Sequence, residues 1–514
     1  MQERGKNKQL FINMLASFIS FGVGTGIGLL LTPYIVKRLG AEAYGFVGLS
    51  NTLISYAGLV TVALNGMSGR FIALAYNKGQ IAEANKYYSS VFYANAFMSA
   101  FITLAFVGCT IWLEYMINIP DEMLLDVKCL FALLALTNVI SMMTGVYGTA
   151  TYIKNRLDLS SVRTIISQVL RSVILLIAFG LFSAKIWYIG LSGIICTFYL
   201  FITNIYLAHK LTPDLRVNKR NFDWIKIKEL LTTGVWNLIT KIGDLLANGV
   251  DLLFANIFIG PAAMGVFAVT KTVPAMVQAL MANVSGVFGP ILLQLYAKDD
   301  KDGIANEIQT SIRIQAIMSA VPLSILYVLG EEFYRLWLPT QNAHWLYILT
   351  IAATSSMALW QPLESLWNIF TITNKVKLAS LAILLNNGLT FLIAFIAMFV
   401  VESPEIRLLI LAGTKNVLKF ILTSTFLPIV TARLIGVSGG TFYPIIIKYV
   451  SGFITICVIG LIIKQFVNIN SWHSWIICSC VLGIICMVIY FFAVLKSTDR
   501  VLIQSLIFKI LPNK

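Results

Sequence analysis

Long apolar stretches account for nearly all of this 514-residue chain and restrict its possible folds more than any other feature. There are about fourteen of them, and each is long enough to cross a bilayer as a helix. Hydrophobic residues make up 58% of the chain and charged residues only 12%, which excludes an ordinary soluble enzyme. Because lipid cannot satisfy backbone hydrogen bonds, we expect the spans to be helices; the runs lack the alternation of a membrane β-barrel. The sequence therefore predicts an all-α polytopic membrane protein.

The predicted spans are joined by short connections. The longest connection, 209–228, leaves no room for a folded soluble domain. The spans are expected at 10–34, 44–69, 88–113, 124–152, 161–183, 187–208, 229–256, 264–295, 312–337, 345–373, 377–401, 405–431, 442–465 and 474–495.

Lysine and arginine are unevenly divided between the two sets of connections. Of the 38 basic residues, 25 fall on the set that includes both termini and the 209–228 linker, 7 on the opposite set and 6 inside spans. Basic residues collect on the cytoplasmic side, so we expect a multi-pass membrane protein with both termini in the cytoplasm. The net charge of +15 then reflects topology, with membrane lipids as neighbours and no nucleic-acid partner, because no folded basic domain exists.

Two parts of the chain repeat each other. Residues 39–78 align with 259–298 at a constant offset of 220 with 8 identities in 40, among them Gly40 with Gly260 and Gly45 with Gly265. Six spans separate the copies, which preserves orientation and predicts two six-helix lobes related by a pseudo-two-fold along the membrane normal. The expected division is a lobe at 1–208, a cytoplasmic linker at 209–228, a lobe at 229–431, and two further helices with a cytoplasmic tail at 432–514.

The usual signatures of bound cofactors are missing from the sequence. No Walker-type phosphate loop occurs, and the glycines at 22, 24, 26 and 28 lie inside a span, where close helix packing or a bend is the favoured interpretation. The seven cysteines are scattered and the three histidines lie far apart, so neither group predicts a metal site. We therefore expect no cofactor, no metal and no catalytic residues.

Charged side chains inside spans are the informative polar residues, because each costs roughly 2.5–3.5 kcal/mol to insert. Lys241, Asp244 and Asp251 share one helical face at spacings of 3 and 7. A buried Lys241–Asp244 pair that only joins helices is one interpretation. However, the repeat places Phe21, Gly24 and Leu31 at the equivalent positions, so the architecture does not demand these charges. A functional role is favoured.

The candidate roles follow from charge. Lys271 and Lys241, with Arg70, are candidates to contact an anionic substrate, and Asn51 aligns with Lys271 in the repeat. The carboxylates Asp244, Asp251 and Glu364 are candidates for coupling transport to protons or other cations. An interhelical hydrogen bond or a snorkelling end residue is an equally open interpretation for Asn51, Asn65, Arg70 and Glu364.

The opening of the chain resembles a known family. Phe11–Gly40 and the turn after it, with FGVGTGIGLLLTPYIVKRLGAEAYGFVGL, together with fourteen spans in a 6+6+2 plan, resemble the bacterial O-antigen and capsule repeat-unit flippases. These proteins belong to the multidrug/oligosaccharidyl-lipid/polysaccharide exporter superfamily, with a MATE-like fold. Unlike members that flip peptidoglycan precursor, the first span here carries no arginine before Lys37.

The resemblance implies a mechanism. The substrate would be an undecaprenyl-pyrophosphate-linked oligosaccharide, held in a cationic cavity and carried across by alternating access for polysaccharide biosynthesis. A polysaccharide polymerase and a chain-length regulator are possible partners, and H⁺ or Na⁺ a possible coupling ion.

Two alternatives remain open. One is a cation-coupled drug or metabolite antiporter of the same superfamily, although such antiporters usually have twelve spans. The other is a membrane-embedded glycosyl- or acyltransferase, which usually shows a long outer loop or clustered acids and histidines. The acidic loop 114–128 is short and no such cluster occurs.

Overall fold

The computed structural model describes residues 2–496 and residue 500. The chain forms two compact units, residues 1–269 and 270–514, which are described separately. The predicted division into lobes at 1–208 and 229–431 stays a prediction, and the predicted tail from 501 onward lies outside the described residues. The described residues form helices and no strands, as the sequence predicts.

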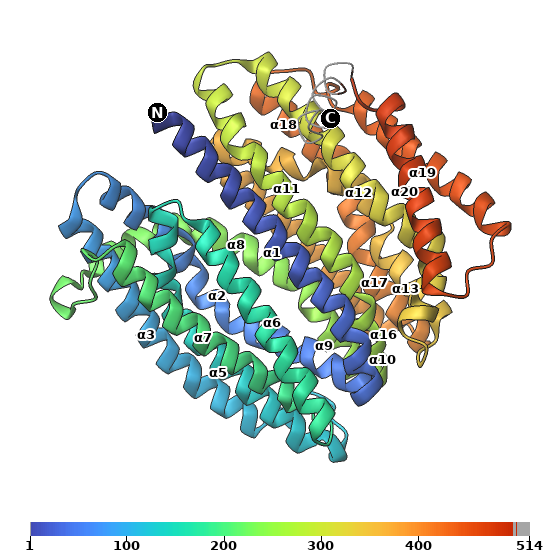
Figure 1. Cartoon of the computed structure of the whole chain (residues 1–514), viewed down its shortest axis with the longest axis horizontal. Helices are drawn as coiled ribbons and strands as arrows, with labels where there is room; N and C mark the ends of the chain where they lie inside the picture. Colours follow the sequence, from blue (N-terminus) through green and yellow to red (C-terminus); the bar gives the residue numbers. More distant parts are fainter. Residues whose placement is uncertain (1, 497–499, 501–514) are drawn as a thin grey trace, which may run out of the picture. The chain divides into compact units, whose positions relative to one another are not determined.

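The first unit is built mainly from long helices (Figure 1). Its α-helices are α1 (Gln2–Leu39), α2 (Ala41–Asn77), α3 (Ile81–Ile111), α4 (Leu113–Met116), α5 (Leu124–Ile153), α6 (Leu157–Leu181), α7 (Trp187–Leu211), α8 (Trp224–Asn248), α9 (Val250–Phe254) and α10 (Pro261–Thr270). Short 3₁₀ turns η1 (Asp121–Met123) and η2 (Lys219–Asn221) and a π-helical turn η3 (Ala255–Ile259) join them.

Within this unit, α5 packs along α7, α2 along α8 and α1 along α6. Gly24 allows α1 to approach α6 closely, because a Cβ there would stand 2.6 Å from the Gln168 Nε2. Gly22 and Gly26 have open space instead, so close packing explains only part of the glycine-rich stretch. α1 continues through Pro33 to Leu39.

Helix α2 is bent by 58° between Ala41–Leu59 and Leu64–Asn77. Thr61 lies at the bend and donates its hydroxyl hydrogen bond to the Gly58 carbonyl at 3.0 Å. A threonine that bonds back into its own helix competes with the backbone ladder and favours such a bend.

The second unit contains the remaining helices. They are α11 (Thr272–Ala297), α12 (Lys301–Trp337), α13 (Ala343–Thr354), α14 (Met357–Trp360), the 3₁₀ segment η4 (Gln361–Leu366), α15 (Trp367–Ile372), α16 (Val376–Val400), α17 (Pro404–Ile421), the π-helical turn η5 (Leu422–Phe426), α18 (Leu427–Ile435), α19 (Tyr443–Gln465) and α20 (Trp472–Ala493).

Helix α12 is the central element of the second unit and contacts α11, α13, α19 and α20. Ile308, Ile312 and Leu323 along it are fully buried in a large apolar cluster. The helix begins with a capped turn, since Asp300 accepts a hydrogen bond from the Gly303 amide at 2.8 Å.

Among the described residues, twelve helical stretches are long and apolar enough to cross a membrane, and the bent α2 makes a thirteenth. Some of the twelve join consecutive elements, as α10 and α11 do. The remaining predicted span, the tenth at 345–373, is not one helix but α13, α14, η4 and α15 in succession. Pro362 near the start of η4 removes a backbone donor, which accounts for part of this interruption. The α12 helix also begins at Lys301, eleven residues before the predicted span.

The two repeat copies meet at their glycine turns, inside the first unit. Gly40 and Gly260 both have positive φ, 90° and 134°, at equivalent junctions between helices. A Cβ on Gly45 would lie 2.8 Å from the Gly265 Cα, so the α2 and α10 backbones touch at this pair. The repeat alignment thus marks a real helix contact.

Candidate functional site

The predicted charges of the seventh span lie on α8 and α9. Lys241 is exposed on α8 and Asp244 is half-buried one turn later. Helix α8 ends at Asn248, and Asp251 stands in the first turn of α9, where its Oδ1 accepts a hydrogen bond from the Leu252 amide at 2.7 Å. The carboxylate is thereby held at the start of a short helix.

The neighbouring helix α2 packs against this segment. A Cβ on Gly249 would lie 3.2 Å from the Tyr56 ring and 3.3 Å from Thr52. Further along, the Asn237 side chain of α8 lies 3.3 Å from the position of a Cβ on Gly66. The α2–α8 contact therefore extends over several turns.

Asn51 belongs to the same part of α2. Its side chain is exposed and donates a hydrogen bond to the Val47 carbonyl of its own helix at 2.9 Å. Because this hydrogen bond lies within α2, it does not support the interpretation that Asn51 forms an interhelical hydrogen bond.

Two predicted residues lie in the second unit. Lys271 is half-buried at the junction where α10 ends and α11 begins, and its carbonyl accepts the hydrogen bond of the Ala275 amide at 3.1 Å. Glu364 is half-buried within η4, between the buried residues Leu363 and Ser365. Lys271 therefore lies between two helices and Glu364 lies in a 3₁₀ segment, so neither residue is in the middle of a regular α-helix.

A cavity of about 320 Å³ opens between α2 and α5 in the first unit. This α2–α5 cavity carries no charged side chain on its wall, and Arg70 follows one of its wall residues, Gly69, along α2. Arg70 is exposed. The wall residues that matter below are Asn65, Ser68, Ser141, Gly145, Gly148, Thr149 and Tyr152.

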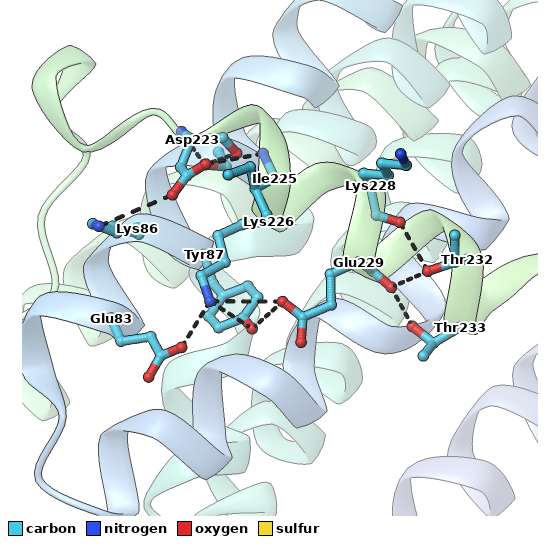
Figure 2. A network of polar contacts seen from close by, with 11 residues as sticks. Glu83, Lys86, Tyr87, Asp223, Ile225, Lys226, Lys228, Glu229, Thr232 and Thr233 are labelled. Carbon is cyan, nitrogen blue, oxygen red and sulfur yellow. Dashed lines mark hydrogen bonds and ion pairs between the residues drawn. The ribbon is translucent and has the colours of Figure 1, made fainter.

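Polar contacts that the sequence alone does not reveal join the 209–228 linker to α3 (Figure 2). The Lys226 ammonium donates to Glu83 at 2.7 Å and to the Tyr87 hydroxyl at 3.2 Å. Tyr87 in turn donates to Glu229 at 2.7 Å. In each of these contacts the two partners are more than 130 positions apart in sequence, so no local pattern predicts the pairing.

The same turns of α3 also satisfy the backbone of the linker. Asn85 donates to the Asp214 carbonyl at 2.8 Å and accepts from the Arg216 amide at 2.8 Å. Ser90 bonds both the amide and the carbonyl of Asp223, at 2.8 and 3.2 Å. The linker is therefore an ordered strap against α3.

On the opposite set of connections, Lys128 forms an ion pair with Glu114 and donates to the Ile111 carbonyl at 2.9 Å. The hydrogen bond from Lys128 lowers the pKa of Glu114, because it stabilises the ionised carboxylate. In the described part of the chain, no group of three or more histidine, cysteine, aspartate or glutamate residues is arranged to hold a metal ion.

Comparison with known proteins decides the family. Residues 35–343 match the model of a family described as polysaccharide biosynthesis protein. The chain belongs to this polysaccharide biosynthesis family. A curated relative, the uncharacterized membrane protein EpsK of Bacillus subtilis, is 27% identical over 495 residues, which covers 96% of this chain and 97% of EpsK.

Solved structures show which fold this member of the polysaccharide biosynthesis family has. The lipid II flippase MurJ in an inward closed conformation matches with a TM-score of 0.66 at 13% identity and covers 97% of this chain and 100% of MurJ. An inward-facing MATE multidrug transporter of the MOP superfamily matches with a TM-score of 0.66 at 12% identity, over 83% of this chain and 98% of the transporter. The predicted MATE-like, all-helical membrane fold is confirmed.

Proposed function

We propose that this protein translocates undecaprenyl-pyrophosphate-linked oligosaccharide repeat units across the bacterial cytoplasmic membrane by alternating access. The observation that carries the proposal is the combination of polysaccharide biosynthesis family membership with the complete fold of a lipid-linked precursor flippase. Both termini and the linker would be cytoplasmic. The protein would act with a polysaccharide polymerase and a chain-length regulator, and it would be a transporter rather than an enzyme.

The predicted residues take roles in this proposal. Lys271, Lys241 and Arg70 would contact the diphosphate, and Asn51 would contact the substrate at the position equivalent to Lys271. An ammonium or guanidinium group binds phosphate oxygens with charge-assisted hydrogen bonds, which are about twice as strong as neutral ones. Asp244, Asp251 and Glu364 would take up H⁺ or Na⁺ as the protein returns to its loading state.

The sidedness of the lipid-linked oligosaccharide tests the proposal. In cells that lack this protein, the completed repeat unit should accumulate and react with a membrane-impermeant lectin only after permeabilisation. Restoring the gene should make it reactive in intact cells. Completed repeat units that still reach the outer face in its absence would refute the proposal, and a repeat unit that is never completed would point to an enzyme.

The second candidate is a cation-coupled antiporter, because MATE transporters share the fold. The coverage favours the flippase, since the MATE match leaves part of this chain unaligned whereas the MurJ match spans 97% of it. Resistance to cationic dyes on expression, without any change in lipid-linked oligosaccharide, would favour the antiporter.

A further inference from the structure

The α2–α5 cavity has the chemistry of a site for a neutral, hydroxyl-rich ligand. Its volume of about 320 Å³ lies within the range of small-molecule sites. Hydroxyl and amide groups line it and no wall residue is charged. An apolar chain would leave their unused lone pairs and the Asn65 amide donor without a ligand partner, and an anion would find no countercharge on the wall.

The hydroxyl groups on the wall are arranged as acceptors. Ser68 donates its own proton to the Asn65 carbonyl at 3.1 Å, Ser141 to Thr137 at 2.8 Å and Thr149 to Val146 at 2.6 Å. With each proton used inside its own helix, the oxygen lone pairs remain to accept hydrogen bonds. A ligand that carries several O–H donors satisfies them.

A donor on the same wall is fixed by a buried neighbour. Asn95 is fully buried, and its Nδ2 donates to the Met142 carbonyl at 3.3 Å and to the Asn65 Oδ1 at 2.9 Å. Because the Met142 carbonyl can only accept, the orientation of the Asn95 amide is set, and so is that of Asn65. The Asn65 Nδ2 is then turned away from Asn95 and is available to a ligand oxygen.

The glycines on the wall provide room that helix packing does not require. A Cβ on Gly145 or Gly148 would meet no atom within 4 Å, so neither glycine is there to let another helix approach. Glycine inside a helix costs roughly 0.5–1 kcal/mol relative to alanine. These two glycines leave the wall open for a ligand, which explains why glycine rather than alanine stands at both positions.

We propose that the α2–α5 cavity binds a sugar residue of the lipid-linked oligosaccharide. The proposal rests on the proposed function and assigns the carbohydrate to a site separate from the diphosphate contacts. Tyr152 is a further residue of the cavity wall.

Binding to two lipids that differ only in the sugar tests this site. The purified full-length protein is titrated with the lipid-linked repeat unit extracted from cells that lack it, and separately with undecaprenyl diphosphate, and native mass spectrometry measures both affinities. Gly145→Leu fills the cavity and Asn65→Ala removes the donor. Each variant should bind the sugar-bearing lipid about tenfold more weakly, because one or two hydrogen bonds between the sugar and the cavity wall are lost. The affinity for undecaprenyl diphosphate should not change.

Gly180→Leu is the matched control, because a Cβ at this α6 glycine also meets open space but lies outside the cavity. It should bind both lipids like the wild type. If Gly145→Leu fails to fold, Gly148→Ala and Asn65→Ala carry the test. Unchanged affinity in the cavity variants, or equal loss for both lipids, overturns the sugar site but not the flippase. A wild type that does not distinguish the two lipids also overturns the site, whereas only the sidedness experiment decides the flippase.

Discussion

At the residue scale, Gly265 occupies a position that no larger residue can take without moving the backbone of α2. A Cβ there would lie 2.5 Å from the Ala41 carbonyl oxygen. Gly265→Ala should therefore destabilise the protein by about 1–3 kcal/mol, as overpacking typically does. Thermal unfolding of the purified protein in detergent measures the effect.

Gly58→Ala is the control for this substitution, because a Cβ at Gly58, on α2, meets open space. It should unfold at the wild-type temperature or slightly above it. Equal stability of the two alanine variants would show that the α2 and α10 backbones are not in contact at Gly265.

Lys271 and Asn51 hold equivalent positions in the repeat but differ in charge. If Lys271 contacts the diphosphate, Lys271→Ala should lower export of the repeat unit at least tenfold, because a hydrogen bond to a charged group is worth about 1.5–3 kcal/mol. Asn51→Ala should be milder. Lys271→Arg, which keeps the positive charge, should retain more export than Lys271→Ala.

Export is measured as surface polysaccharide at matched protein level in the membrane. Near-normal export by Lys271→Ala would remove this lysine from the anion site. A matched loss in the alanine and arginine variants would instead indicate that shape at the α10–α11 junction, rather than charge, is what matters.

At the element scale, the ordered linker is the feature with a direct test. Lys226 holds the start of α8 against α3 through Glu83 and Tyr87, whereas Lys228 is exposed two residues later (Figure 2). Lys226→Ala should loosen the linker and speed tryptic cleavage near Arg216 and Arg220 about two- to fivefold, the range that one partly exposed ion pair supports. Lys228→Ala should leave the rate unchanged.

Digestion of inverted membrane vesicles, which present the predicted cytoplasmic side, gives these rates. The same cleavage rate in the Lys226→Ala variant and the wild type would mean that the backbone bonds made by Asn85 and Ser90 hold the strap alone.

The sequence predicts the helices better than the contacts between them, for physical reasons. Long apolar runs require helices in lipid, so the predicted spans correspond to helices, except at 345–373, where the run is apolar but broken near Pro362. The Glu83–Lys226 contact depends on the tertiary path of the chain, which no local pattern encodes. Most residues of the cavity wall are serine, threonine and glycine, which also serve ordinary helix packing, so composition does not distinguish the wall.

At the scale of the whole molecule, the orientation across the membrane is the property on which every functional role depends. The excess of basic residues predicts that the 209–228 linker is cytoplasmic and that the acidic 114–128 loop lies outside. Single cysteines in place of Lys219 and Glu122 can report on which side of the membrane each segment lies, since both positions are exposed. The seven native cysteines must first be replaced, and two of them, Cys196 and Cys486, are buried.

In intact cells, a membrane-impermeant maleimide should label the Glu122→Cys protein almost fully and the Lys219→Cys protein only after permeabilisation. The opposite pattern would place the linker outside and would put the Arg70 end of α2, with the α2–α5 cavity, in the outer half of the membrane. The cavity would then meet the sugar after translocation rather than before it. The proposed function starts from a lipid-linked repeat unit on the cytoplasmic face, so under that proposal only the predicted orientation places this cavity on the loading side.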